Sequence, residues 1–208
     1  MKAFFLTRNP VYLQTQQLTI RSISHLFHIA DIVSAPASNK WKINYVCEKC
    51  MQIQENGRIY LIVVDGEIYK IGSSTSNGGI RNTLTSYMNG LGGSPSLRTF
   101  GIHMLIQEQL DSGKLIQIYA KFNHPIEIVI NGLTSSISKL TYPQIKDMED
   151  LCREDYKKIY NKYPIWNFQE NKEQFPQHIQ MAHAEHLQKQ KMKRVLKPKS
   201  DINPLDDK

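Results

Sequence analysis

The stretch that decides the fold covers residues 57–72 and reads Gly57-Arg58-Ile59-Tyr60-Leu61-Ile62-Val63-Val64-Asp65-Gly66-Glu67-Ile68-Tyr69-Lys70-Ile71-Gly72. Two runs rich in β-branched and aromatic residues flank an Asp-Gly pair, and residues of these types favour a half-buried pleated strand. The pattern therefore predicts a β-hairpin whose turn lies at the Asp-Gly pair.

The length of this turn decides which side chains share a face, because successive side chains of a strand point to opposite faces. A two-residue turn would place Tyr60 and Lys70 on opposite faces of the hairpin. A three-residue turn, with Gly66 at positive φ in a bulge, would pair Tyr60 directly with Lys70. We expect the three-residue turn, because it also gathers one apolar face for the core, made of Ile59, Leu61, Val63, Tyr69 and Ile71.

A polar segment, residues 73–79, follows the hairpin and leads into a predicted short helix over residues 80–88. This helix would bring Arg81 back beside the two strands. Lys70 follows Tyr60 by ten residues, and Arg81 follows Lys70 by eleven. The hairpin and the helix are thus expected to place a phenol, an ammonium and a guanidinium in one region.

The spacing of these residues resembles the GIY-YIG nuclease superfamily. The chain reads Arg58-Ile59-Tyr60 in place of Gly-Ile-Tyr, and Lys70-Ile71-Gly72 with lysine in place of the second motif tyrosine. Lysine there is similar to a subset of small type II restriction endonucleases, which also end the domain with a segment like Tyr163-Pro164-Ile165-Trp166-Asn167. The resemblance spans residues 58–170. It implies an α+β fold with a small, mainly antiparallel sheet, a hairpin plus one or two strands, flanked by helices.

In that superfamily the first tyrosine, the second motif position, a helix arginine and a later glutamate form a metal-dependent phosphodiesterase site. The resemblance implies that Tyr60 is the general base, with a pKa lowered by Lys70 and by the metal-bound phosphate. Arg81 would clamp the scissile phosphate. Glu149 would hold one Mg²⁺, and Glu154 is the alternative metal ligand.

The two glutamates belong to a predicted helix over residues 143–162. Its apolar stripe at helical spacing consists of Ile145, Met148, Leu151, Cys152 and Ile159. Glu149 and Glu154 lie beside this stripe, where a carboxylate could face the hairpin. Either could instead pair with a basic residue four positions away on the helix surface.

Two further side chains are candidates for contact with a substrate. Relatives often have His or Tyr four residues after the helix arginine, where this chain has Thr85, so Tyr87 could supply the missing phenol. Asn167 could either bond a phosphate or fix the backbone of the site. Trp166 is expected in the core.

The other elements follow from periodicity and from turn residues. Residues 13–32 and 101–112 have apolar positions at helical spacing, and Gly113 would end the second of these helices. Residues 115–122 alternate like a strand, and residues 126–130 are predicted to form an edge strand. We expect three parts: an N-terminal helical extension (1–50), the catalytic domain (51–170), and a basic C-terminal helix (about 177–195) with a tail (171–208 in all).

The composition is that of a soluble globular protein with an anionic partner. The 208 residues are 40% hydrophobic and 22% charged, with a net charge of +7 and a pI near 9.2. This balance favours nucleic acid, and the resemblance implies that it is double-stranded DNA. A basic helix containing Lys191, Lys193 and Arg194 would track its phosphates. No run approaches the ~20 apolar residues of a membrane span. The three cysteines fit a reducing compartment, so we expect a cytoplasmic protein without a membrane partner.

Two motifs suggest other chemistry. Cys47-Glu48-Lys49-Cys50 has the spacing of half a zinc site, but Cys152 and the histidines are scattered in the sequence, so ordinary cysteines are the expected interpretation. Residues 89–95 are rich in glycine yet lack the Gly-Lys-Ser/Thr ending of a phosphate-binding P-loop. No nucleotide cofactor is therefore expected.

These observations together predict a site-specific double-stranded DNA endonuclease, a type II restriction enzyme. A small nuclease that must cut both strands would act as a homodimer, because two-fold symmetry presents one site to each strand. One alternative is a non-catalytic DNA-binding module on the same fold. Another is a homing or repair nuclease, which usually carries an additional recognition domain.

Overall fold

The structure is a computed structural model and describes residues 23, 25–35, 40–54, 56–124, 126–131 and 137–195. Its centre is a five-stranded sheet with strand order β2-β1-β5-β3-β4, in which all neighbours are antiparallel. The predicted α+β fold is therefore confirmed. The strands of this sheet are β1 (Phe27–Ala35), β2 (Lys40–Tyr45), β3 (Arg58–Val64), β4 (Glu67–Ser74) and β5 (Ile116–Phe122).

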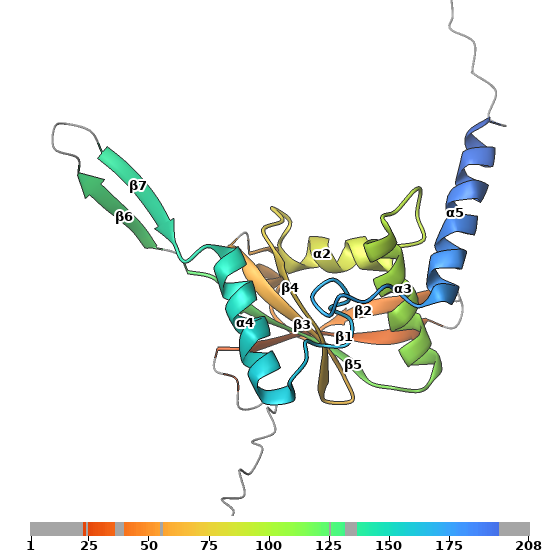
Figure 1. Cartoon of the computed structure of the whole chain (residues 1–208), viewed down its shortest axis with the longest axis horizontal. Coiled ribbons are helices and arrows are strands. Elements are labelled where there is room, and N and C mark those ends of the chain that lie inside the picture. Colours follow the sequence, from red (N-terminus) through yellow and green to blue (C-terminus); the bar gives the residue numbers. More distant parts are fainter. Residues whose placement is uncertain are drawn as a thin grey trace, which may run out of the picture.

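Helices cover both faces of the sheet (Figure 1). In the described part of the chain they are α1 (Lys49–Ile53), α2 (Gly79–Met88), α3 (Leu97–Asp111), α4 (Ile145–Tyr160) and α5 (Gln177–Val195). Helices α2 and α3 pack on one face, α4 packs on the other, and α5 lies against α3.

Four helices lie where periodicity predicts them. The predicted ranges 80–88, 101–112, 143–162 and 177–195 correspond to α2, α3, α4 and α5. Helix α3 begins earlier than predicted, because the side chain of Ser96 accepts a hydrogen bond from the backbone N–H of Thr99 at 3.2 Å. Gly113 follows the end of α3 with a φ of +74°, as expected for a residue that ends a helix.

The helix predicted over residues 13–32 is wrong where the structure describes it, because residues 27–32 belong to β1. Strand β1 lies inside the sheet between β2 and β5, and Ile29, Ala30 and Ile32 are buried. A strand covered on both faces carries apolar residues in succession, and a short run of this kind also fits helical spacing. Residues 13–22 lie outside the described part. Two strands of the central sheet thus come from the segment that was predicted as an N-terminal helical extension.

A second, two-stranded sheet projects from the body of the molecule (Figure 1). Strand β6 (Ile126–Asn131) pairs antiparallel with β7 (Ile137–Tyr142). The strand predicted over residues 126–130 is present, but it is not an edge strand of the main sheet. Its partner β7 was not predicted.

The predicted hairpin forms with a different turn. Asp65 and Gly66 both have positive φ, at +48° and +86°, and Val64 pairs with Glu67, which defines a two-residue type I′ turn in place of the predicted three-residue turn. A bulge in β4 then inserts Tyr69 as an extra residue. Because the bulge shifts the register by one position, Tyr60 and Lys70 still lie on the same face.

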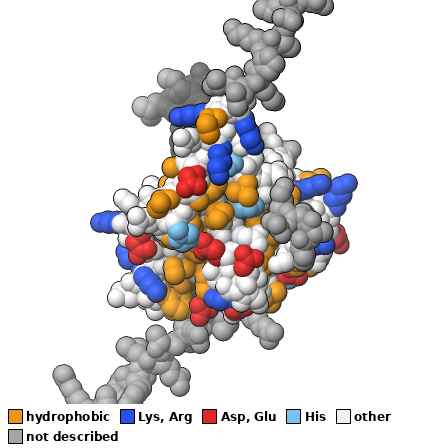
Figure 2. Space-filling view, turned by 90° about the vertical axis from the view of Figure 1, so that its right-hand side faces the viewer, with side chains coloured by type: hydrophobic (Ala, Val, Ile, Leu, Met, Phe, Trp, Pro, Cys, Tyr) orange, Lys and Arg blue, Asp and Glu red, His pale blue; other side chains and the backbone are white. Residues whose placement is uncertain are grey.

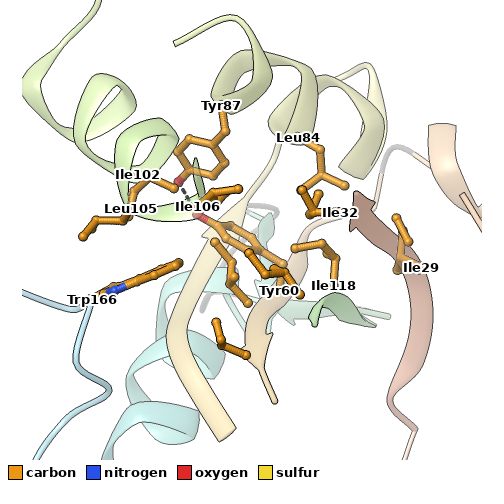
Figure 3. Close-up of a cluster of buried hydrophobic side chains, with 14 of the residues drawn as sticks. Ile29, Ile32, Tyr60, Leu84, Tyr87, Ile102, Leu105, Ile106, Ile118 and Trp166 are labelled. Atoms are coloured by element: carbon orange, nitrogen blue, oxygen red, sulfur yellow. Dashed lines mark hydrogen bonds between the residues drawn. The ribbon is translucent and has the colours of Figure 1, made fainter. Parts of the chain in front are cut away.

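Both faces of the hairpin are buried. Ile59, Leu61, Val63, Ile68 and Ile71 form a small cluster against Tyr156 of α4. The larger cluster, shown in Figure 3, lies under α2 and α3 and includes Tyr60. Tyr69 packs against this larger cluster, because the bulge turns it away from the face on which it was predicted. On α4, Ile145, Met148 and Cys152 pack as predicted, while Leu151 is 60% exposed.

Candidate active site

Tyr60 lies in the middle of β3 at the bottom of the candidate site. It is 1% exposed, and its hydroxyl oxygen is 2.6 Å from that of Tyr87 on α2 (Figure 3). Arg98, in the first turn of α3, is within hydrogen-bonding range of both phenols. Burial, together with Tyr87, raises the pKa of Tyr60 well above its usual value. In the protein alone, burial therefore outweighs the lowering expected from Lys70.

Gly72 lies directly opposite Tyr60 on β4. A Cβ atom at this position would lie 2.5 Å from both Cζ and Oη of Tyr60, closer than real carbon contacts allow. The glycine of the Lys70-Ile71-Gly72 motif thus has a steric reason: it lets the Tyr60 ring cross the neighbouring strand.

Lys70 is 5% exposed and lies on the same face of the hairpin as Tyr60. Burial and the nearby guanidinium of Arg98 lower the pKa of Lys70 to about 8, against opposing effects of Glu170 and Glu149. Lys70 therefore exchanges its proton close to physiological pH.

Glu149 faces the hairpin from α4 and is 8% exposed. Its Oε2 accepts a 2.6 Å hydrogen bond from the hydroxyl of Ser73, and its Oε1 lies 3.5 Å from Nη1 of Arg153. The alternative ligand, Glu154, is exposed and accepts a hydrogen bond from the hydroxyl of Tyr163. Of the two carboxylates, only Glu149 lies at the site.

Two pockets of about 330 Å³ each adjoin these residues. We call the first the acid pocket; its charged lining residues are Lys70, Arg98, Lys146, Glu149, Arg153 and Glu170. We call the second the hydroxyl pocket; besides Tyr60, Tyr87, Arg98 and Thr99 it is lined by Ser73, Ser74, Ser76, Asn82, Thr83 and Ser86. The pockets are neighbours, because Arg98 lines both and Ser73 of the second donates to Glu149 of the first.

Arg81 lies elsewhere. Helix α2 buries Ile80, Leu84 and Tyr87 against the sheet, so Arg81 points sideways, is exposed, and lies close enough to Tyr45 of β2 to affect its pKa. It lines neither of the two pockets described above. The structure thus does not bring Arg81 together with Tyr60 and Lys70.

Arg98 is the residue that sequence reasoning missed. No motif spacing points to Arg98. The resemblance implies an arginine on the helix that is α2 in the structure, whereas Arg98 belongs to the next helix, α3. The available signal is local: Ser96 predicts a helix start and so places Arg98 in the first turn of α3.

Asn167 holds the free edge of β4. Its Oδ1 accepts a hydrogen bond from the backbone N–H of Ile71 at 2.9 Å, and its Nδ2 donates to the carbonyl of Ile71 at 2.9 Å. The backbone N–H of the neighbouring Trp166 donates to the carbonyl of Tyr69 at 2.8 Å, and Trp166 is buried as predicted. Of the two roles considered for Asn167, these contacts correspond to fixing the backbone.

Helix α5 is attached to α3 and to the loop before it through its histidines. His183 and His186 contact the carbonyl oxygens of Pro95 and Gly93, each at 2.9 Å, and His178 contacts Glu108 at 2.7 Å. On the face that carries α5, basic side chains gather toward the end where the chain leaves the helix (Figure 2). Lys191 and Lys193 of α5 are exposed, while the side chain of Arg194 lies outside the described part. Their contact with DNA stays a prediction.

Cys47 and Cys50 are free thiols, and Cys50 contacts Glu48 at 3.4 Å. Among the described residues, no three His, Cys, Asp or Glu side chains cluster closely enough to hold a metal by themselves. Within the same residues, no helix combines the length and apolarity needed to cross a bilayer.

Comparisons with known proteins include two partial structural likenesses that can be described. No family model matches the sequence, and no curated protein matches it significantly. The restriction endonuclease HPY188I in complex with product DNA has a TM-score of 0.42 and 24% identity, covering 73% of this chain and 86% of its own. A mutant of bacteriophage T4 EndoII has a TM-score of 0.44 and 16% identity, covering 73% of this chain and 99% of its own.

Proposed function

We propose that the protein is a metal-dependent phosphodiesterase that cleaves double-stranded DNA, a type II site-specific endonuclease of the GIY-YIG kind. The observation that supports it is the convergence of Tyr60 from β3, Lys70 from β4, Arg98 from α3 and Glu149 from α4 on two adjoining pockets. Hydrolysis of a phosphodiester needs a proton acceptor for water, neutralisation of the phosphate charge and support for the leaving oxygen. The four groups are of the types that these tasks require.

The acid pocket fits one Mg²⁺ ion. Mg²⁺ in phosphate-processing sites is usually held by one or two carboxylates, with substrate oxygens and waters completing the shell. Glu149 would be the protein ligand, and its contacts with Ser73 and Arg153 orient the carboxylate. When bound, the ion would polarise the phosphate and stabilise the leaving oxygen.

Arg98 would clamp the scissile phosphate in the role that the resemblance assigned to Arg81. It lines both pockets and lies near Lys70, so its guanidinium can face the oxygens of a phosphate bound in either pocket. Arg98 also donates to the phenol oxygens of Tyr60 and Tyr87, and these contacts would hold its guanidinium in position.

Lys70 would accept the proton of the attacking water. A pKa near 8 leaves about a tenth of the amine neutral at pH 7, which is suitable for a general base. Tyr60, whose pKa is raised, would keep its proton and donate to a phosphate oxygen. This reverses the roles implied by the resemblance.

Plasmid cleavage tests the proposal. We expect nicking and linearisation with Mg²⁺, none with EDTA, and discrete ends at one short sequence. Glu149→Ala should reduce the rate by about two orders of magnitude or more, in the range seen for loss of one charge-stabilising group. Glu154→Ala is the matched control on the same helix and should cleave like the wild type.

The same assay separates the alternatives. DNA binding without cleavage under any metal condition would indicate the non-catalytic DNA-binding module. Cleavage directed by a long site or by DNA structure would indicate a homing or repair nuclease. Sedimentation of the protein with its cleavage site would show whether it acts as the expected homodimer.

A further inference from the structure

The hydroxyl pocket has a wall of short polar side chains that the reaction described above does not use. Ser74 and Ser76 come from the end of β4 and the loop after it, and Asn82, Thr83 and Ser86 come from α2. The acidic residue nearest in the hydrogen-bond network, Glu149, lines the acid pocket instead. All lining side chains of the hydroxyl pocket are neutral except Arg98, which is cationic.

Internal hydrogen bonds occupy the hydroxyl hydrogens of Ser73, Thr83 and Ser86, and they leave those of Ser74 and Ser76 to donate to a ligand. The hydroxyl oxygen of Ser74 accepts from the hydroxyl of Thr83 at 2.7 Å and from the backbone N–H of Ser76 at 3.2 Å. A serine hydroxyl has two acceptor sites and one hydrogen, so these two bonds leave the hydrogen of Ser74 to donate. The hydroxyl oxygen of Ser76 likewise accepts from Nδ2 of Asn82 at 2.7 Å.

We propose that the hydroxyl pocket binds a second backbone phosphate of the cleaved strand, next to the scissile phosphate, with Arg98 between the two. The inference rests on the proposed function and adds a subsite to it. A phosphodiester oxygen is an acceptor only, so a donor-lined pocket with one guanidinium complements it. Serine, threonine and asparagine contacts to phosphate fix the position of the strand without reading its sequence.

Arg98 explains why the two phosphates would be neighbours. It lines both pockets and contacts Tyr60 and Tyr87, which line the hydroxyl pocket. A bound strand would therefore pass from the acid pocket to the hydroxyl pocket across this arginine. The subsite would hold the strand in register with Lys70 and Glu149.

The test uses DNA duplexes that contain the cleavage site and carry a single uncharged methylphosphonate at each phosphate around it. Binding in EDTA and cleavage in Mg²⁺ are measured for wild type, Ser74→Ala and Asn82→Asp. Asn89→Asp is the matched control, because it adds the same charge at the other end of α2, outside both pockets. Asn82 is exposed in the first turn of α2, where a negative charge favours the helix, so Asn82→Asp should fold.

We expect Asn82→Asp to weaken DNA binding about tenfold relative to Asn89→Asp, because a carboxylate replaces a donor beside the phosphate. One methylphosphonate next to the scissile position should weaken wild-type binding and add little in Ser74→Ala. Equal binding by Asn82→Asp and Asn89→Asp, or equal effects of every methylphosphonate in wild type and Ser74→Ala, would overturn the subsite. Failure of the proposed function gives a different result, because unmodified DNA then stays uncut. The comparison of DNA binding by Asn82→Asp and Asn89→Asp still decides whether the hydroxyl pocket contacts a phosphate.

Discussion

At the scale of single residues, burial determines the chemistry of the site. Tyr60 and Lys70 lie on one face of the hairpin, yet burial moves their pKa values in opposite directions, up for the phenol and down for the ammonium. Lys70 thus becomes the group that releases its proton first. The spacing predicts that both residues belong to the site, and the resemblance implies Tyr60 as the proton acceptor. Neither carries information on burial, on which the proposal of Lys70 as the acceptor rests.

The pH dependence of cleavage follows from the Lys70 pKa of about 8. Below that pH the amine is protonated and cannot accept a proton, so the rate should rise up to about tenfold per pH unit toward pH 8 and level off above it. Single-turnover cleavage in Mg²⁺ between about pH 6 and pH 9.5 measures this profile. A rate that falls as the pH rises through the Lys70 pKa would mean that Lys70 acts as a cation instead of a base.

At the scale of elements, the spacing of apolar residues and the turn residues predicted most of the helices and the hairpin. They did not predict β1, because an interior strand and a short helix carry similar apolar runs, and they did not predict β7. The turn was predicted one residue too long, since the extra residue lies in the bulge at Tyr69. The segment around Asn167 replaces a further strand at the edge of β4, which no periodic signal could indicate.

Asn167 provides a test of that edge. Asn167→Asp removes the N–H group that donates to the carbonyl of Ile71. It also introduces a charge at a position that is 2% exposed. We expect a loss of about 3 kcal/mol in the free energy of unfolding, measured by urea denaturation. Asn89→Asp, at the exposed C-cap of α2, should cost about 1 kcal/mol or less, because a negative charge there opposes the helix dipole only weakly. A similar small change for Asn167→Asp would show that its contacts do not hold the edge.

At the scale of the whole molecule, the candidate site forms where three parts of the chain meet around two adjoining pockets. The hairpin supplies Tyr60 and Lys70, α4 supplies Glu149 from 76 residues beyond its partner Ser73, and the first turn of α3 supplies Arg98. Tyr60, Lys70 and Glu149 are candidates from the sequence that line these pockets, and their roles stay predictions. The resemblance implies an arginine on α2, whereas the arginine that lines both pockets belongs to α3. Which helix turns its first residues toward the pockets depends on packing against the sheet, and distance along the chain does not reveal it.

The choice of arginine is the most direct test of the site. Plasmid cleavage rates of Arg98→Ala and Arg81→Ala, measured side by side in Mg²⁺ with folding checked by circular dichroism, decide it. We predict that Arg98→Ala loses about two orders of magnitude or more in rate, while Arg81→Ala stays within about threefold of wild type. Full activity of Arg98→Ala together with loss of activity in Arg81→Ala would contradict the site as described.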